Sequence, residues 1–245
     1  MNGLIIFLGE SFRLGCQGTR NRGHPESYNE QINACNSHIH FIENTITKYN
    51  MNSMSVFISS YTTQFESQLL SIYNKYLIGS HFYSDMIGIT NLFQDSINKI
   101  ENIANYDFIF YIRIDLCLKP LFIDLFNPYQ NMILYPTICW ILLNYCSNHP
   151  RVNDMMLFIP KKYYKYLQNI TICHETWYNL MHSTDLTYDD MDTLIHTYHD
   201  SDSCKDYNPL YYIVNRPENS TFHSDGYIFD KHNFSGHIYK ETNCL

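Results

Sequence analysis

Short apolar runs alternate with helical periodicity through the first half of the chain. Leu4–Leu8 is an apolar run between two glycines and predicts a core strand. Apolar side chains then recur at helical spacing, which predicts a helix over Ser27–Tyr49 through Ile32, Cys35, Ile39, Ile42 and Ile46. The same patterns predict, in chain order, a strand over Ser55–Tyr61 and helices over Gln64–Tyr76 and Met86–Asn105. This alternation is typical of an α/β fold with a mostly parallel sheet.

The second half of the chain has a looser pattern. It predicts strands over Met132–Pro136 and Met155–Ile159, a helix over Lys161–Gln168, and short helices over Thr176–Met181 and Asp189–His196. The tail from Asn208 is aromatic and irregular. Since no repeat, low-complexity tract or proline-rich linker interrupts the chain, we predict a single domain over residues 1–245.

The segment Tyr106–Leu118 combines a buried strand with two charges. Its residues from Phe108 to Ile114 are mostly aromatic or β-branched, which is typical of a strand covered on both faces. Because side chains alternate along a strand, Arg113 and Asp115 lie on the same side. One interpretation is a structural ion pair that closes the strand end. The other is an acid placed to hold a metal or a substrate, since ligands of open α/β sheets bind beyond the carboxyl ends of strands.

Composition and charge exclude several classes of protein. Hydrophobic residues make up 45% and charged residues 16% of the chain, which is not the composition of a disordered segment. The net charge of −8 excludes general nucleic-acid affinity, but it leaves room for a local basic site that binds one small anion. The 8 cysteines form no CxxC pair, so we expect reduced thiols. The sequence shows no signal peptide and no membrane span, and we expect a soluble cytoplasmic protein.

The loop between Gly9 and Gly23 follows the first predicted strand and precedes a helix, where nucleotide phosphates are usually held. Its glycines allow close backbone approach, and Arg13, Arg20 and Arg22 offer forked donors suited to phosphate oxygens. The loop matches neither the GxGxxG nor the P-loop pattern. The alternative is a flexible surface loop whose arginines bind nothing.

Two later groups carry side chains suited to chemistry. Asp154 precedes an apolar run, where an acid serves as a helix N-cap or as a general base that faces a cleft. His199 lies in the densest group of metal-capable side chains, His196–Ser203, whose carboxylates and imidazoles suit Mg²⁺ or Mn²⁺. The alternative for this group is a solvated polar turn whose Asp and Ser side chains bond their own backbone.

The segment Tyr106–Leu116 resembles the "YDFVIRxRxDL"-type strand of small viral and bacterial glycosyltransferase-like proteins with a GT-A fold. The resemblance implies a GT-A-like (Rossmann-like) α/β fold, with a nucleotide-binding half over residues 1–125. Residues 126–245 would complete the acceptor and metal sites. It further implies a UDP- or GDP-sugar donor, a glycan or glycoprotein acceptor, and Mn²⁺ or Mg²⁺ as cofactor.

The resemblance also assigns roles to single residues. Where the family carries its metal-binding DxD motif, this chain reads Arg113-Ile114-Asp115, so only the last acid is present. Asp115 and His199 are the implied metal ligands, and Asp154 is the implied catalytic base. The residues implied to bind the nucleotide-sugar are Arg13, Gly15, Arg20, Arg22, Thr62, Arg113 and Asp115.

The function predicted from these features is a glycosyltransferase that moves a sugar from a nucleotide-sugar to a glycan or protein. One alternative is another nucleotide-dependent transferase, such as a nucleotidyl- or phosphotransferase, because fold alone does not choose between these reactions. The other is a non-catalytic binding protein that keeps the fold, for instance in a virion. The enrichment in Asn and Tyr with few Gly indicates an AT-rich genome, consistent with a large DNA virus and a location in host cytoplasm or virion.

Overall fold

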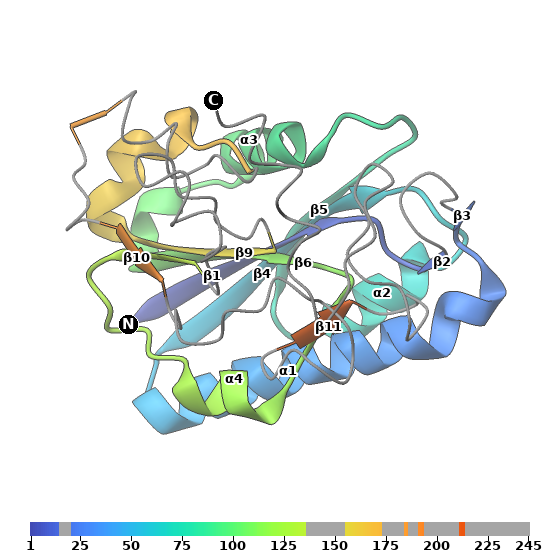
Figure 1. The fold of residues 1–245 in the computed structure, drawn as a ribbon, viewed down its shortest axis with the longest axis horizontal. Coiled ribbons are helices and arrows are strands. Elements are labelled where there is room, and N and C mark those ends of the chain that lie inside the picture. The colour runs from blue at the N-terminus through green and yellow to red at the C-terminus, as the bar shows by residue number, and fades with distance from the viewer. Residues whose placement is uncertain (15–20, 136–154, 173–183, 186–190, 194–210, 214–245) are drawn as a thin grey trace, which may run out of the picture.

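The computed structural model describes residues 1–14, 21–135, 155–172, 184–185, 191–193 and 211–213 of the 245-residue chain. Seven strands in this part of the chain form one sheet in the order β10-β8-β9-β6-β1-β4-β5 (Figure 1). In chain order they are β1 (Asn2–Gly9), β4 (Ser53–Tyr61), β5 (Leu77–Tyr83), β6 (Phe108–Arg113), β8 (Ile133–Tyr135), β9 (Met156–Pro160) and β10 (Met191–Thr193). Only β9 runs antiparallel to its neighbours within this sheet. The predicted fold class, an α/β fold with a mostly parallel mixed sheet flanked by helices, is therefore confirmed.

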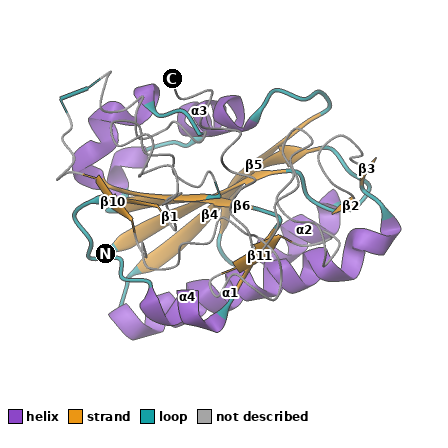
Figure 2. Ribbon diagram, in the orientation of Figure 1, coloured by secondary structure: helices purple, strands orange, loops and turns teal. Residues whose placement is uncertain are grey.

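Helices cover both faces of the sheet (Figure 2). One face is covered by α1 (Tyr28–Tyr49), α2 (Glu66–Tyr73) and α4 (Pro120–Leu125), and the other by α3 (Ile89–Lys99) and the 3₁₀ helix η3 (Lys161–Asn169). The central strand β1 divides its side chains between two cores, with Ile5 and Phe7 in the first and Leu4, Ile6 and Leu8 in the second. All five are fully buried, which explains why this strand reads as a continuous apolar run.

The chain reverses its direction of winding at β1. From β1 it passes through α1 to β4 on one side, and from β5 it passes through α3 to β6 on the other side of β1. The helices α1 and α3 consequently lie on opposite faces. The carboxyl ends of β1 and β6 flank the point where the strand order reverses, and in open α/β sheets this point is where ligands bind.

Both strands at this switch point are followed by a small two-stranded element. After β1, β2 (Arg13–Leu14) pairs with β3 (Asn21–Arg22), and after β6, β7 (Leu116–Leu118) pairs with β11 (Tyr211–Ile213). The 3₁₀ turn η1 (Pro25–Ser27) then leads into α1, and η2 (Ile103–Asn105) leads towards β6. No helix in the described part of the chain is long and apolar enough to cross a membrane.

Several predicted elements differ from the structure. The helix predicted over Gln64–Tyr76 ends at Tyr73, and the strand β5 that follows it was not predicted. The helix predicted over Asp189–His196 is wrong at Met191–Thr193, which form a strand because they pair with β8. The irregular tail contains β11, and the helix predicted over Lys161–Gln168 is of the 3₁₀ type. The helix predicted over Thr176–Met181 lies outside the described residues.

Candidate functional site

Asp115 lies in the turn between β6 and β7, where its carboxylate binds two arginines. Its Oδ1 accepts a hydrogen bond from Nε of Arg113 at 2.9 Å, and its Oδ2 accepts one from Nη2 of the same residue at 2.5 Å. Oδ2 also accepts from Nη2 of Arg13 at 3.2 Å. The Asp115 side chain is only 2% exposed. The expectation that Arg113 and Asp115 point to the same side is confirmed by this forked contact.

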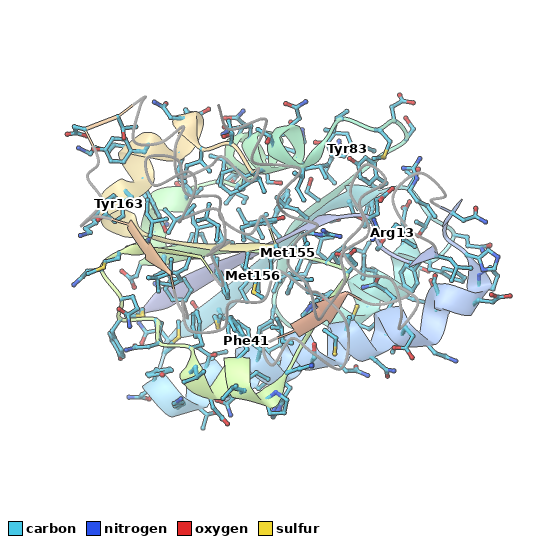
Figure 3. All side chains as sticks on the ribbon, viewed as in Figure 1. Arg13, Phe41, Tyr83, Met155, Met156 and Tyr163 are labelled. Atoms are coloured by element: carbon cyan, nitrogen blue, oxygen red, sulfur yellow. The ribbon has the colours of Figure 1, made fainter. Side chains whose placement is uncertain are left out.

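Arg13 connects the loop after β1 to the turn after β6. Its Nη1 donates to Oε2 of Glu10 at 3.1 Å, while its Nη2 donates to Asp115, 102 residues away in the sequence. Glu10 and Arg13 are 7% and 5% exposed. Figure 3 labels Arg13 on the segment that follows β1. Buried charges are tolerated when they are paired. Here each charge contacts the next one, in the order Glu10, Arg13, Asp115 and Arg113. We call these four residues the ion cluster.

Arg22 adds a third arginine next to the ion cluster. In the pairing of β2 with β3 it lies directly opposite Arg13, which brings two like charges together. Its guanidinium carbon lies 5.0 Å from the centre of the Tyr61 ring, a cation–π contact at the carboxyl end of β4. Its Nη1 atom is buried and has no hydrogen-bond partner among the described residues. Among the residues that the structure describes, nothing accepts a hydrogen bond from this buried cationic donor.

A glutamine on α1 holds the two loops of the switch point together. The fully buried Gln31 accepts a hydrogen bond from the backbone N–H of Phe12 at 3.0 Å and donates one to the carbonyl of Ile114 at 2.7 Å. Phe12 has a φ of 51°, a conformation that costs a bulky residue about 1–3 kcal/mol. Packing of its ring against Tyr28 and Phe65 offsets part of that cost. The loop after β1 is thus held in a defined position.

Two further side chains of α1 bind the segment after the turn. His38 donates from Nε2 to the carbonyl of Leu116 at 2.6 Å, so its Nδ1 accepts from the hydroxyl of Tyr73, also at 2.6 Å. Burial lowers the pKa of His38 from 6.5 to about 4, which keeps the ring neutral at pH 7. Ser37 accepts from the backbone N–H of Leu118 at 3.0 Å. The backbone of this segment is therefore satisfied by side chains of α1 as well as by β11.

Sequence reasoning missed these polar contacts of α1. It predicted the helix from apolar positions that include Ile32, Ile39 and Ile46, and these three side chains are partly buried and pack against the core. The fully buried positions include Gln31 and His38, which are seven residues apart and hence on one face of the helix. Two polar residues at that spacing beside an apolar stripe were the signal available in the sequence.

The predicted site residues fall into three groups. The structure brings together Arg13, Arg113 and Asp115, with Arg22 opposite Arg13. Thr62 is exposed, and its backbone N–H donates to the carbonyl of Tyr83 at 2.9 Å, so within the described ranges its hydrogen bonds are with β5 and not with the ion cluster. The residues that lie outside the described part of the chain are Gly15, Arg20, Asp154 and His199, and their roles stay predictions.

The described surroundings of Asp115 do not fit a divalent cation. Both of its oxygens already accept hydrogen bonds from guanidinium groups. A cation bound to the same carboxylate would lie beside two positive charges in a buried, weakly screened place. Within the described ranges, no three His, Cys, Asp or Glu side chains are grouped so as to hold a metal ion. The predicted partnership of Asp115 with His199 stays a prediction.

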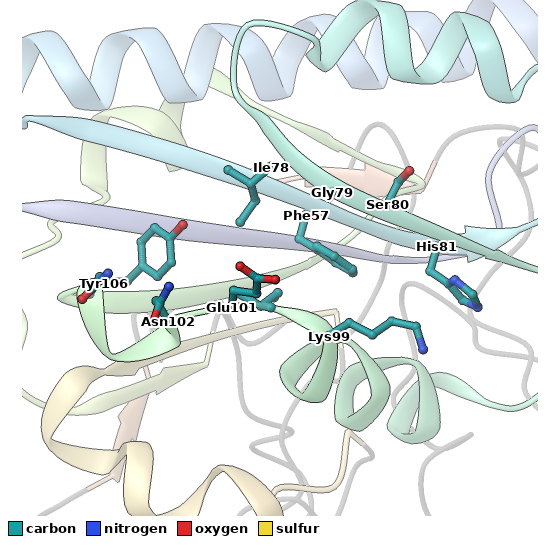
Figure 4. Close-up of a pocket in the computed structure, with 11 residues that line it drawn as sticks. Phe57, Ile78, Gly79, Ser80, His81, Lys99, Glu101, Asn102 and Tyr106 are labelled. Carbon is teal, nitrogen blue, oxygen red and sulfur yellow. The ribbon is translucent and has the colours of Figure 1, made fainter.

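A separate hollow of about 580 Å³ lies beside the edge strand β5 (Figure 4). Its lining comes from β4, β5 and the segment that leads from α3 to β6 and includes Lys99, Glu101 and Tyr106. Tyr106 precedes β6, whereas the ion cluster follows it, so the length of that strand, roughly 20 Å, separates the two. None of the predicted site residues in the described part of the chain lines the hollow. The candidate functional site is therefore the ion cluster with Arg22 at the switch point.

Comparisons with known proteins give low similarity. No protein-family model matches the chain, and no curated protein matches it. Among solved structures, galactosyltransferase LgtC in complex with donor and acceptor sugar analogs is 12% identical, with 66% of this chain and 58% of that chain covered at a TM-score of 0.35. A protein assigned as a nucleotide-diphospho-sugar transferase, from Desulfovibrio desulfuricans G20, is 10% identical, with coverages of 74% and 76% at a TM-score of 0.40.

An active-site mutant of LgtC is also similar, at 12% identity and a TM-score of 0.34, with 70% of this chain and 60% of that chain covered. The match therefore spans less than two thirds of the length of LgtC. These solved structures are a galactosyltransferase and a nucleotide-diphospho-sugar transferase, both at low identity to this chain.

Proposed function

We propose that this protein is a nucleotide-sugar-dependent glycosyltransferase whose donor diphosphate binds at the switch point between β1 and β6. The observation that carries the proposal is the gathering of three arginines, Arg13, Arg22 and Arg113, at one edge of the sheet. Arg13 and Arg113 bind two carboxylates, so with Arg22 the described residues of the site carry a net positive charge within a chain of net charge −8. The unused donor of Arg22 supports an anionic ligand in particular. The resemblance of the Tyr106–Leu116 strand selects a nucleotide-sugar among such ligands.

The site's own residues supply two contributions to transfer. The arginines would stabilise the negative charge that grows on the departing nucleoside diphosphate, because forked guanidinium donors match phosphate oxygens and are fixed before the reaction. In the proposed reaction an acceptor hydroxyl forms a bond to the anomeric carbon while the bond from that carbon to the diphosphate oxygen breaks. Asp154 would take the hydroxyl proton as general base. Gln31 would hold the loop that carries Arg13 beside the end of β6 that carries Arg113.

Calorimetry tests the donor site directly. UDP, GDP, their hexose conjugates and ATP are titrated into the full chain, in Mn²⁺ and in EDTA, and donor consumption is then followed with glycan acceptors. We expect at least one nucleoside diphosphate sugar to bind more tightly than ATP. Tighter binding of ATP than of every sugar conjugate would favour a nucleotidyl- or phosphotransferase instead. Failure of all these ligands to bind would refute the proposed function.

Two matched variants give the experiment a local control. Arg22→Gln removes one positive charge from the site, and Lys75→Gln removes one from an exposed ion pair with Glu43. We expect only the first to weaken nucleotide binding. Equal effects of both variants would show that the overall charge of the chain, and not the site, controls binding.

A further inference from the structure

We propose that the arginines of this site take the place of a divalent cation at the donor diphosphate, and that Asp115 is a positioning residue for those arginines. The inference rests on the proposed function, because it describes how the same site neutralises the same ligand. It differs from the role implied by the sequence resemblance, in which Asp115 is a metal ligand. Three observations carry it.

The first observation is the occupancy of the Asp115 carboxylate. Three guanidinium nitrogens lie 2.5–3.2 Å from its oxygens, and the side chain is 2% exposed. To bind a cation, Asp115 would have to release Arg113, which is itself only 12% exposed. Uncoupling a largely buried charge in this way is costly, since the guanidinium would lose both of its hydrogen bonds to the carboxylate and has little access to water. The carboxylate is therefore better suited to fix arginines than to coordinate an ion.

The second observation is the way Arg13 is held. Glu10 accepts from one terminal nitrogen and Asp115 accepts from the other, so the two carboxylates grip the guanidinium from both sides. A long side chain that would otherwise lose much rotamer freedom on binding is thus ordered in advance. Such pre-ordering is what an anion site needs in order to act without a metal.

The third observation is the state of Arg22. It lies opposite Arg13 across the β2–β3 pair, where like charges repel, and its Nη1 atom is buried without a hydrogen-bond partner in the described part of the chain. A phosphate oxygen at this atom would satisfy the donor and offset the repulsion at once. Phosphate and guanidinium also match in geometry, because two parallel N–H donors meet two oxygens.

The test compares nucleotide affinity with and without metal. UDP and GDP are titrated calorimetrically into wild type in excess EDTA and in excess Mn²⁺, with heats of Mn²⁺–nucleotide association subtracted. We expect the two dissociation constants to agree within about threefold, which is less than 1 kcal/mol. We also expect Mn²⁺ alone to leave the melting temperature of wild type unchanged.

Variants of Arg22 test the inference with less risk of a folding defect, because Arg22 forms no ion pair with the residues that the structure describes. Arg22→Gln is expected to weaken binding in EDTA by at least about tenfold, as loss of one charged hydrogen bond predicts. Arg22→Lys keeps the charge but not the fork, and it should recover part of that loss. Lys75→Gln should bind as wild type does. Wild-type affinity in Arg22→Gln would overturn the inference.

The outcomes separate the inference from the function on which it rests. Binding that tightens tenfold or more with Mn²⁺, and loses that gain in Asp115→Asn, would overturn the arginine inference and leave the proposed function standing. No binding of either nucleotide in either buffer would instead refute the proposed function itself. Metal-independent binding that depends on Arg22 would support both.

Discussion

Removal of the Asp115 carboxylate is the most direct perturbation of the ion cluster. Asp115→Ala deletes the acceptor of three guanidinium hydrogen bonds and leaves Arg13 and Arg113 at 5% and 12% exposure. Loss of one partner of a buried ion pair typically costs 3–5 kcal/mol. Since Arg13 keeps Glu10 and Arg113 has some access to water, we expect the lower end, about 3 kcal/mol of unfolding free energy. For a chain of this size the melting temperature should fall by about 6–12 °C.

Urea unfolding followed by circular dichroism measures this cost, provided that the dependence on urea concentration stays unchanged between variants. Asp115→Asn should lose less than Asp115→Ala, because the amide keeps one acceptor oxygen. Glu43→Ala is the control, since it breaks an ion pair whose side chains are 72% and 53% exposed and should leave stability nearly unchanged. A loss below about 1 kcal/mol in Asp115→Ala would refute the reasoning, because a deeply buried partner of two arginines cannot be that dispensable.

Three further predictions concern the scaffold. In His38 the folded pKa of about 4 lies below the ordinary 6.5, so its contribution to stability is complete above pH 6.5 and is lost as the pH falls towards 4. Between pH 7.5 and pH 5 the unfolding free energy of wild type should fall by about 2 kcal/mol more than that of His38→Gln, measured by urea unfolding at both pH values. Equal falls in the two proteins would contradict this prediction. Gln31→Leu orphans two buried backbone groups and should destabilise by about 2–4 kcal/mol, whereas the same change at the exposed Gln68 should not. In Gly3→Ala the new methyl group would lie 2.4 Å from the Phe108 ring. We expect the unfolding free energy to fall by about 1–3 kcal/mol, which thermal unfolding measures. An unchanged unfolding midpoint would contradict this prediction.

The centre of the sheet could be predicted because burial on both faces leaves a continuous apolar run in β1 and β6 and a shorter one, Val56–Ile58, in β4. The edge strand β5 could not, because its middle residues Gly79, Ser80 and His81 are only partly buried and form no such run. The strand Met191–Thr193 could not be predicted either. Its conformation comes from pairing with β8, a contact that no local pattern records.

The contacts of the candidate site also divide into those that a local sequence pattern predicts and those that depend on the folded chain. The contact of Arg113 with Asp115 follows from alternation along one strand and is visible in the sequence. The contact of Arg13 with Asp115 depends on the order of strands in the sheet, which the local pattern does not contain. The position of Gln31 in the core reflects the need of two backbone groups for partners, and that need exists only in the folded chain.

The link between Arg13 and Asp115 also has a consequence for biosynthesis. The proposed anion site joins two segments 102 residues apart, and β1 and β6 pair in parallel over a similar separation. A nascent chain can build β1, α1 and β4 early, but the proposed binding site cannot form until β6 has left the ribosome and docked. Contacts of such long sequence separation form slowly, so ligand binding becomes possible only late in folding. Nucleotide binding at the proposed site would therefore indicate that the sheet is complete, and partly folded chains would not bind the ligand.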